Sequence, residues 1–177
     1  PIRLRGADTM TLASRVGEHA NYLRSLGLRV AIFVDGGGVG GGVVDRLRQL
    51  GFTVLEVQFG GKANDPRRHA NKRAEIWDLM REWLKGGCIA VDEQLATDLT
   101  GVEYGFTAID QIQLEKKQDM KRRGLASPDD GDALAVTFAF PVPIATHDDP
   151  PPVDPAKARE YDPFAGMQRE IELAMVQ

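Results

Sequence analysis

The chain has 177 residues, of which 42% are hydrophobic and 27% charged, and its formal net charge is −4. This length suffices for one substantial hydrophobic core and is short for two full domains, and the composition excludes a wholly disordered, collagen-like or coiled-coil chain. No apolar run approaches the roughly 18 residues of a membrane-spanning helix, and the N-terminus shows no secretory signal pattern. The single cysteine, Cys88, has no partner for an internal disulfide, which suits a reducing compartment.

The pattern of apolar residues in the N-terminal part of the chain predicts a helix followed by a buried strand. Residues 10–26 place apolar side chains at helical spacing, with Asp8 or Thr9 available as the N-cap and Gly27 just beyond the end. The unbroken apolar run over residues 30–34 is typical of a central parallel strand that is covered on both faces.

The alternation of helices and strands continues after a glycine-rich turn. Residues 43–51 predict an amphipathic helix, residues 52–59 a second parallel strand, and residues 69–85 a long helix with one apolar stripe and an opposite charged face. A strand, a helix and a second strand in this order indicate an α/β domain with three layers.

The pattern is weaker beyond Gly86, where we predict a short helix over residues 92–99 and a hairpin with strands near residues 103–106 and 109–114. Ser127 and Pro128 then offer an N-cap followed by proline at the first helical position. The nearly continuous apolar run over residues 133–140 predicts a buried final helix.

A change of composition at Pro141 predicts two regions, a globular domain over residues 1–140 and a proline-rich, acidic linker and tail over residues 141–177. A short amphipathic helix is expected within the tail, over residues 167–175. The tail carries seven acidic and three basic side chains and so accounts for the whole net charge.

Two basic clusters remain within the neutral domain and are candidates for contact with DNA phosphates, although such runs are often only solvated faces. The first comprises Lys62, Arg67, Arg68, Lys72 and Arg73, and the second Lys116, Lys117, Lys121, Arg122 and Arg123. The first cluster is the stronger candidate because it follows the second strand and its loop. In the second cluster, Lys117 and Arg122 are the residues that we expect to contact DNA.

Asp35 ends the first predicted strand, and ligands of open α/β sheets bind beyond the carboxyl ends of the strands. It is therefore a candidate catalytic residue, with the capping of the next helix as the alternative. Asp129 and Asp132 are three residues apart and share a face of the first turn of the final helix, where the helix dipole alone also favours acidic residues.

Neighbouring carboxylates repel one another unless a cation neutralises them, and oxygen ligands suit Mg²⁺ or Mn²⁺. Two such ions can activate a water molecule and stabilise the leaving oxygen of a phosphodiester. Asp35, Asp129 and Asp132 are accordingly the predicted metal ligands and catalytic residues.

The glycine-rich turn, GGGVGGG, is a weak signature for nucleotide binding because it lacks the Lys-Ser/Thr ending of a phosphate-binding P-loop. We favour a structural role, in which the glycines let the backbone turn tightly and approach another chain segment closely.

Four segments in the same order resemble the nuclease domain of the large subunit of bacteriophage terminases: VDGGGVGGGVVDRL, FGGKANDP, NKRAEIWDLMREWLKGG and IQLEKKQDMKRRGLASPDDGDALAVTF. The resemblance runs from about residue 5 to residue 140. It implies an RNase H-like fold with a central mixed sheet, related to Holliday-junction resolvases and integrases, and a metal-dependent endonuclease that cuts concatemeric double-stranded DNA.

By this resemblance, Asp35 is the carboxylate of the central strand, Asp129 is the ligand on the final helix, and Asp132 is a neighbour or third ligand. The family's first acidic residue lies on an opening strand, which we expect this chain to lack, and Asp8 fits a helix cap better than a replacement. The presence of Asp130 and Gly131, where the family has small or apolar residues, leaves open which aspartates bind metal.

The resemblance also implies partners: double-stranded DNA, the portal, the small terminase subunit and an ATPase domain in a longer parent chain. It places the protein in the host bacterial cytoplasm, and we expect the isolated domain to be monomeric. Two alternatives are a catalytically incomplete motor module that binds DNA or portal, and a nucleotide-binding α/β domain that uses the glycine-rich turn.

Overall fold

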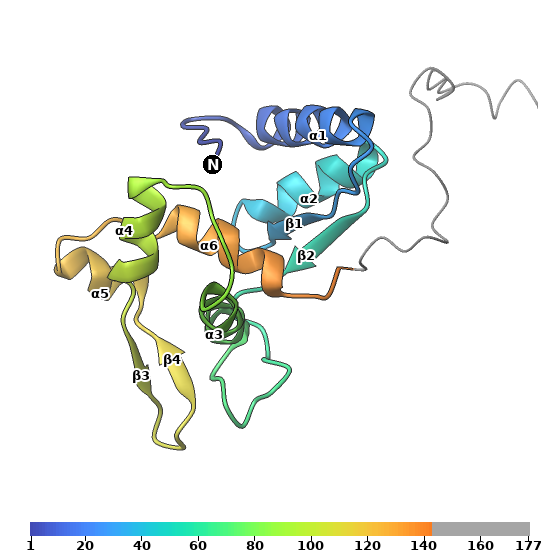
Figure 1. The fold of residues 1–177 in the computed structure, drawn as a ribbon. Helices are drawn as coiled ribbons and strands as arrows, with labels where there is room; N and C mark the ends of the chain where they lie inside the picture. Colours follow the sequence, from blue (N-terminus) through green and yellow to red (C-terminus); the bar gives the residue numbers. More distant parts are fainter. Residues whose placement is uncertain (143–177) are drawn as a thin grey trace, which may run out of the picture.

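Two parallel strands lie between two layers of helices in the computed structural model, which describes residues 1–142 (Figure 1). The strands are β1 (Ile32–Asp35) and β2 (Val54–Val57), and Asp35 is paired with Val57. The helices α1 (Thr9–Ser25) and α2 (Gly40–Gln49) cover one face. The helices α3 (Lys72–Leu84) and α6 (Asp129–Ala135), with a following 3₁₀ turn η1 (Val136–Phe138), cover the other.

The two faces of this small sheet form two hydrophobic cores, because successive side chains of a strand point to opposite sides. Ile32 and Val54 pack with the apolar side chains of α1 and α2, among which Val44 and Leu47 are fully buried. Phe33 and Val57 pack on the opposite side. Their neighbours there come from α3, α6 and η1: Ile76, Trp77, Met80, Ala135 and Val136. The predicted three-layer α/β architecture is confirmed.

A second, antiparallel sheet forms an arm that projects from the layered body (Figure 1). Its strands are β3 (Tyr104–Phe106) and β4 (Ile112–Leu114). Parallel and antiparallel pairing are thus divided between two sheets within the described residues, instead of being mixed in one. The loop between β2 and α3 is joined to the arm, since Ile112 N donates to Arg68 O at 2.7 Å and Ala70 N donates to Ile112 O at 3.0 Å.

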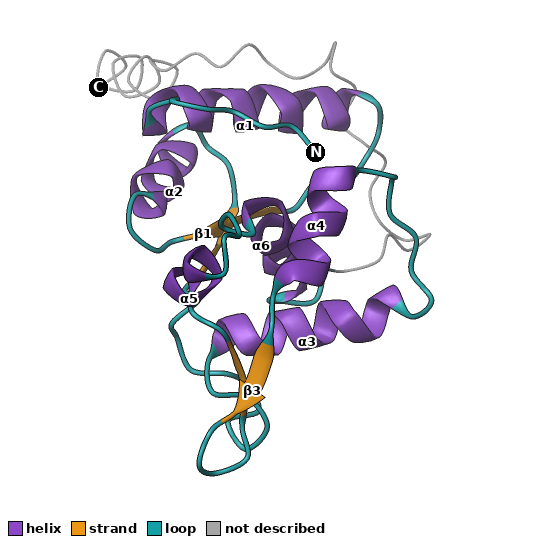
Figure 2. Ribbon diagram, turned by 90° about the vertical axis from the view of Figure 1, so that its left-hand side faces the viewer, coloured by secondary structure: helices purple, strands orange, loops and turns teal. Residues whose placement is uncertain are grey.

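Two shorter helices flank the arm, α4 (Glu93–Gly101) before it and α5 (Lys117–Arg122) after it. Both lie beside the N-terminal end of α6 in two perpendicular views (Figures 1 and 2). Within residues 1–142, no helix is long and apolar enough to cross a membrane.

Most elements with a clear hydrophobic period begin and end near their predicted bounds. Asp8 is the N-cap of α1, and its side chain accepts a hydrogen bond from Thr11 N. The long helix begins later than predicted, at Lys72 with Asn71 as its N-cap, because His69 instead lies in the loop that joins the arm. Helix α5 was not predicted, and the helix predicted over residues 167–175 lies outside the described residues.

The prediction for the final helix was wrong in two respects. The α-helix stops at Ala135 and continues as the 3₁₀ turn η1, instead of running to Phe140. Pro128, not Ser127, occupies the N-cap position, and it supplies no side-chain hydrogen bond. The helix is nevertheless buried on one side, as expected from its apolar sequence.

The glycine-rich turn brings the start of α2 into direct contact with the end of β1. A Cβ atom on Gly40 would lie 1.8 Å from the carbonyl oxygen of Asp35, and one on Gly36 would lie 2.4 Å from Glu56 Oε1. Gly38 has a φ of +56°, which L-residues rarely adopt. These contacts support the structural role that we predicted for the glycines.

We expect Gly40→Ala to lower the free energy of unfolding by about 2 kcal/mol or more, because the methyl group would push α2 away from β1. Gly41→Ala is the matched control, since its Cβ would lie 3.8 Å from its nearest neighbour, Gly36 O, an ordinary contact distance. Alanine there should be neutral or stabilising by up to about 1 kcal/mol. Urea unfolding followed by circular dichroism measures both changes, and equal effects would contradict the assigned role of Gly40.

Candidate metal and nucleic-acid site

Asp132 is a buried carboxylate that three side chains hold in place. Its Oδ1 accepts hydrogen bonds from Arg73 Nε and from Trp77 Nε1, both at 2.9 Å. Its Oδ2 lies 2.9 Å from Lys117 Nζ in an ion pair and has no hydrogen bond of its own. Arg73 and Trp77 belong to α3 and Lys117 begins α5, so Asp132 joins three helices.

Asp129 lies on the same side of α6 as Asp132, as the three-residue spacing predicts, because Lys117 Nζ also lies 3.7 Å from Asp129 Oδ1. The two aspartates differ in environment: the side chain of Asp129 is 79% exposed, whereas that of Asp132 is 8% exposed. The first turn of α6 therefore presents one fixed and one solvent-facing carboxylate to the same cation, the ammonium group of Lys117.

Asp130, the third acidic residue of this turn, is turned toward α4. Arg3 donates to Asp130 Oδ2 at 2.7 Å from its Nε and to Asp92 Oδ1 at 2.6 Å from its Nη2. The backbone N–H groups of Asp130 and Gly131 donate to Oδ2 of Asp98, a buried residue of α4. These contacts join residues too far apart in sequence for local spacing to reveal them.

Asp35 is partly buried at the carboxyl end of β1, as predicted. Its Oδ1 accepts a hydrogen bond from Gly37 N at 3.1 Å and so braces the glycine-rich turn. Within residues 1–142, no group of three or more His, Cys, Asp or Glu side chains is arranged to hold a metal ion. The structure thus brings Asp129 and Asp132 together around the ammonium group of Lys117, whereas Asp35 belongs to no such acidic group.

The acidic turn has the chemistry that a divalent cation requires. Asp132 Oδ2 already faces a positive charge and is not occupied by a hydrogen bond, and the exposed Asp129 can adjust its position. Hard divalent cations prefer such carboxylate oxygens. Asp129 and Asp132 thus offer the oxygen ligands that such an ion prefers, and in this structure Lys117 supplies the compensating charge.

Three of the predicted DNA-binding residues are ion-paired with carboxylates of the protein, and two of them, Lys72 and Arg73, are largely enclosed. The Lys72 side chain is 7% exposed, and its Nζ lies 2.6 Å from Glu75 Oε2. Arg73 is held by Asp132, and Arg68 lies 2.8 Å from Asp78 Oδ2. In this arrangement the charges of Lys72 and Arg73 stabilise the fold, and neither side chain is free to reach a phosphate.

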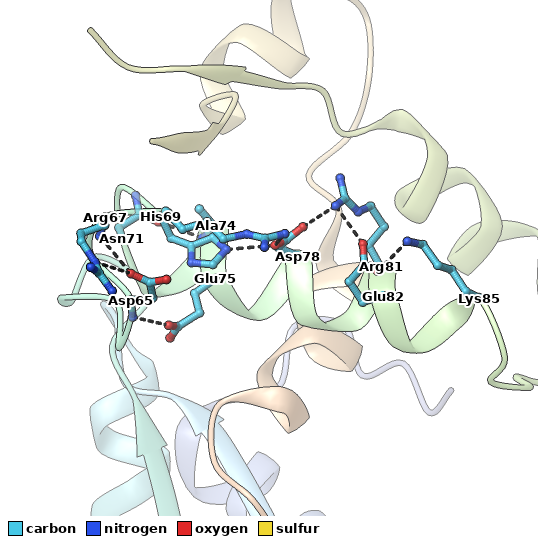
Figure 3. A network of polar contacts seen from close by, with 11 residues as sticks. Asp65, Arg67, His69, Asn71, Ala74, Glu75, Asp78, Arg81, Glu82 and Lys85 are labelled. Carbon is cyan, nitrogen blue, oxygen red and sulfur yellow. Dashed lines mark hydrogen bonds and ion pairs between the residues drawn. The ribbon is translucent and has the colours of Figure 1, made fainter. Parts of the chain in front are cut away.

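The loop and α3 share a network of polar contacts, and Glu75 and Asp78 of α3 are among its acceptors (Figure 3). His69 Nε2 lies 3.0 Å from Asp78 Oδ2, and Arg81 Nη2 lies 2.7 Å from Asp78 Oδ1. Burial raises the pKa of Asp78, but its hydrogen bond to His69 and the charges of Arg81 and Arg68 outweigh burial and lower that pKa below its ordinary value. The network therefore keeps a charged carboxylate beneath the loop.

The remaining predicted DNA-binding residues are exposed. Lys62 and Arg67 lie in the loop between β2 and α3, and Arg67 has a side chain that is 95% exposed. Lys117 and Arg122 lie on α5. Lys62, Arg67 and Arg122 can meet a nucleic acid without loss of a buried contact, whereas Lys117 also pairs with the buried Asp132.

No known protein-family model matches the chain, and no curated protein is significantly similar in sequence. Solved structures are similar in fold. The nuclease domain of the large terminase subunit gp2 of bacterial virus Sf6 superposes with a TM-score of 0.61 at 19% identity, over 77% of this chain and 74% of that chain. A point mutant of that domain with manganese gives a TM-score of 0.62 at 18% identity, over 77% of this chain and 76% of that chain.

The same mutant with calcium gives a TM-score of 0.62 at 18% identity, over 77% and 74% of the two chains. The chain therefore has an RNase H-like fold. More particularly, it has the fold of a phage terminase nuclease domain, and the resemblance seen in the sequence is confirmed at the level of the fold.

We expect Asp132→Asn to lower the free energy of unfolding by about 3 kcal/mol, because it leaves the buried guanidinium of Arg73 without its counter-charge. Asp129→Asn is the matched control on the same helix turn, and its exposed side chain should change stability by no more than about 0.5 kcal/mol. Urea unfolding of both variants checks this. A small effect at both positions would show that the Arg73–Asp132 pair does not stabilise the fold.

Proposed function

We propose that this chain is the nuclease domain of a phage DNA-packaging terminase and cuts double-stranded DNA by metal-dependent hydrolysis of phosphodiester bonds. The observation that carries the proposal is the acidic turn of α6, where Asp129 and Asp132 both face the ammonium group of Lys117. This turn belongs to a fold that is similar to a terminase nuclease domain. Related structures solved with manganese and with calcium support a divalent cation, and we propose two Mg²⁺ or Mn²⁺ ions.

In the proposed mechanism, Asp35, Asp129 and Asp132 are the metal ligands. A pair of divalent ions would supply the activation of water and the stabilisation of the leaving oxygen. Asp132 is fixed in direction by Arg73 and Trp77, so its Oδ2, which faces Lys117, keeps one position. Asp129 is free to follow the substrate, and Lys117 offsets the negative charge of the turn.

The partners follow from the same proposal. Concatemeric double-stranded DNA is the substrate, the portal and small terminase subunit are the assembly partners, and an ATPase domain in a longer parent chain supplies translocation. Host cytoplasm is the proposed place of action, and the isolated domain is proposed to be a monomer.

We expect Mn²⁺ to promote cleavage of a supercoiled plasmid by this chain and Asp35→Asn to reduce the cleavage rate by at least about 100-fold, since it removes one ligand charge. Asp45→Asn is the matched control, because Asp45 is exposed on α2. Agarose gel electrophoresis of nicked and linear products measures the rate. Unchanged cleavage by Asp35→Asn would overturn the assignment of Asp35.

A catalytically incomplete module is the other outcome of this experiment. In that case wild-type chain would not nick DNA with any divalent metal, yet it would bind DNA with an affinity that falls as salt rises.

Arg67 provides a test of the DNA surface. Arg67→Ala should weaken binding to duplexes of unrelated sequence to a similar extent and reduce the slope of log affinity against log salt by about 1, the loss of one phosphate contact. Arg15→Ala serves as control, because Arg15 is exposed on α1 and, among residues 1–142, pairs only with Glu18 of the same helix. Fluorescence anisotropy at several salt concentrations gives both slopes. Equal slopes for the two variants would remove the loop from the DNA surface.

A further inference from the structure

Asp98 is a buried acidic residue of α4 that neither the fold's hydrophobic cores nor the proposed chemistry uses. It is 5% exposed. Its Oδ2 accepts hydrogen bonds from the backbone N–H groups of Asp130 at 2.8 Å and of Gly131 at 3.2 Å. Its Oδ1 accepts from Gln94 Nε2 at 3.0 Å, which fixes the direction of the carboxyl group.

The first turn of α6 depends on this contact because it has no cap of its own. Pro128 provides no side-chain acceptor, and α6 has only seven residues, so local hydrogen bonds alone do not fix its direction. Asp98 takes the role of the missing cap from another helix, and it does so at the peptide groups between Asp129 and Asp132.

Trp77 of α3 also packs against this turn. A Cβ atom on Gly131 would lie 2.8 Å from Trp77 Cη2 and 3.3 Å from Asp98 Cβ, so the backbone of Gly131 fills the space between α3 and α4. The indole of Trp77 also donates to Asp132. The turn is thus held between two fixed groups, and a shift of its backbone would move both Asp129 and Asp132.

We propose that Asp98 is a positioning residue, which holds the backbone of Asp130 and Gly131 so that Asp129 and Asp132 present their carboxylates to the metal. The inference rests on the proposed nuclease function. Asp98 touches neither metal nor DNA in this role. It acts through its two hydrogen bonds to the backbone of Asp130 and Gly131, which lie between the two proposed ligands.

The side chain of Asp130 has a different assignment. Arg3 holds it next to Asp92, the N-cap residue of α4, and so directs it away from Lys117, the cation that Asp129 and Asp132 share. This contact adds a second link between α4 and α6. It removes Asp130 from the candidate ligands and leaves Asp129 and Asp132 as the pair that Asp98 positions.

The test measures the affinity of the full 177-residue chain for Mn²⁺, by the electron paramagnetic resonance signal of free Mn²⁺. Asp98→Ala should weaken the affinity by about 10-fold, the usual effect of losing a group that orients metal ligands. Asp98→Asn should stay close to wild type, because its amide oxygen can accept both backbone N–H groups while Gln94 turns its own amide to accept from the new NH₂ group. Thr100→Ala is the control, since within the described part of the chain that hydroxyl bonds only to Ala96 O of its own helix.

A merely structural role would lower the melting temperature of Asp98→Ala and leave its Mn²⁺ affinity unchanged below that temperature, and this result would overturn the inference. Equal weakening in Asp98→Ala and Asp98→Asn would also overturn it, because the charge of Asp98 and not its hydrogen bonds would then be responsible. Wild-type chain that binds no Mn²⁺ would reject the proposed function itself.

If Asp98→Ala does not fold, Gln94→Leu replaces it in the test. Leucine has a similar volume and removes the donor that orients Asp98. We expect an affinity about threefold weaker than that of wild type, corresponding to the loss of one ordinary hydrogen bond. An unchanged affinity in this variant would overturn the inference.

Discussion

The buried charge of Asp132 constrains the arrangement of the helices on one side of the sheet. A carboxylate can remain charged in a protein interior only if cations and hydrogen-bond donors surround it. Arg73 and Trp77 of α3 and Lys117 of α5 meet this requirement together. The position of α6 relative to α3 and α5 is therefore set by the same contacts that fix a proposed metal ligand, and the stability of the fold cannot be separated from the geometry of the site.

A similar requirement explains why part of the first basic cluster is paired with carboxylates of α3. The acidic residues Glu75 and Asp78 lie on the side of α3 that the loop covers, and each needs a positive partner. Lys72 and Arg68 serve them, and the hydrogen bond from Lys72, together with N–H groups of the loop, lowers the pKa of Glu75 despite its burial. Within this cluster, the positive charge that remains exposed lies on Lys62 and Arg67 and on the outer part of Arg68.

The sequence allowed the layered body to be predicted because its elements have a regular hydrophobic period. The apolar run before Asp35 and the spacing of Asp129 and Asp132 are local signals, and the structure places these residues at a strand end and on one helix side. The cap of α6 could not be predicted. Asp98 is separated from Gly131 by 33 positions, and its sequence neighbourhood resembles any amphipathic helix. The inward direction of Lys72 likewise depends on a loop that packs over α3 only in the folded chain.

The hydrogen bond from Trp77 to Asp132 gives the site an intrinsic optical reporter. An indole whose N–H points at a carboxylate emits according to the charge near its ring, so any change in the neutralisation of Asp132 alters the fluorescence of Trp77. The second tryptophan, Trp83, packs at 5.6 Å against the ring of Phe138 and has no contact with the acidic turn among the described interactions. Its emission therefore supplies an internal reference, and occupation of the turn by a cation can be followed in the unlabelled protein.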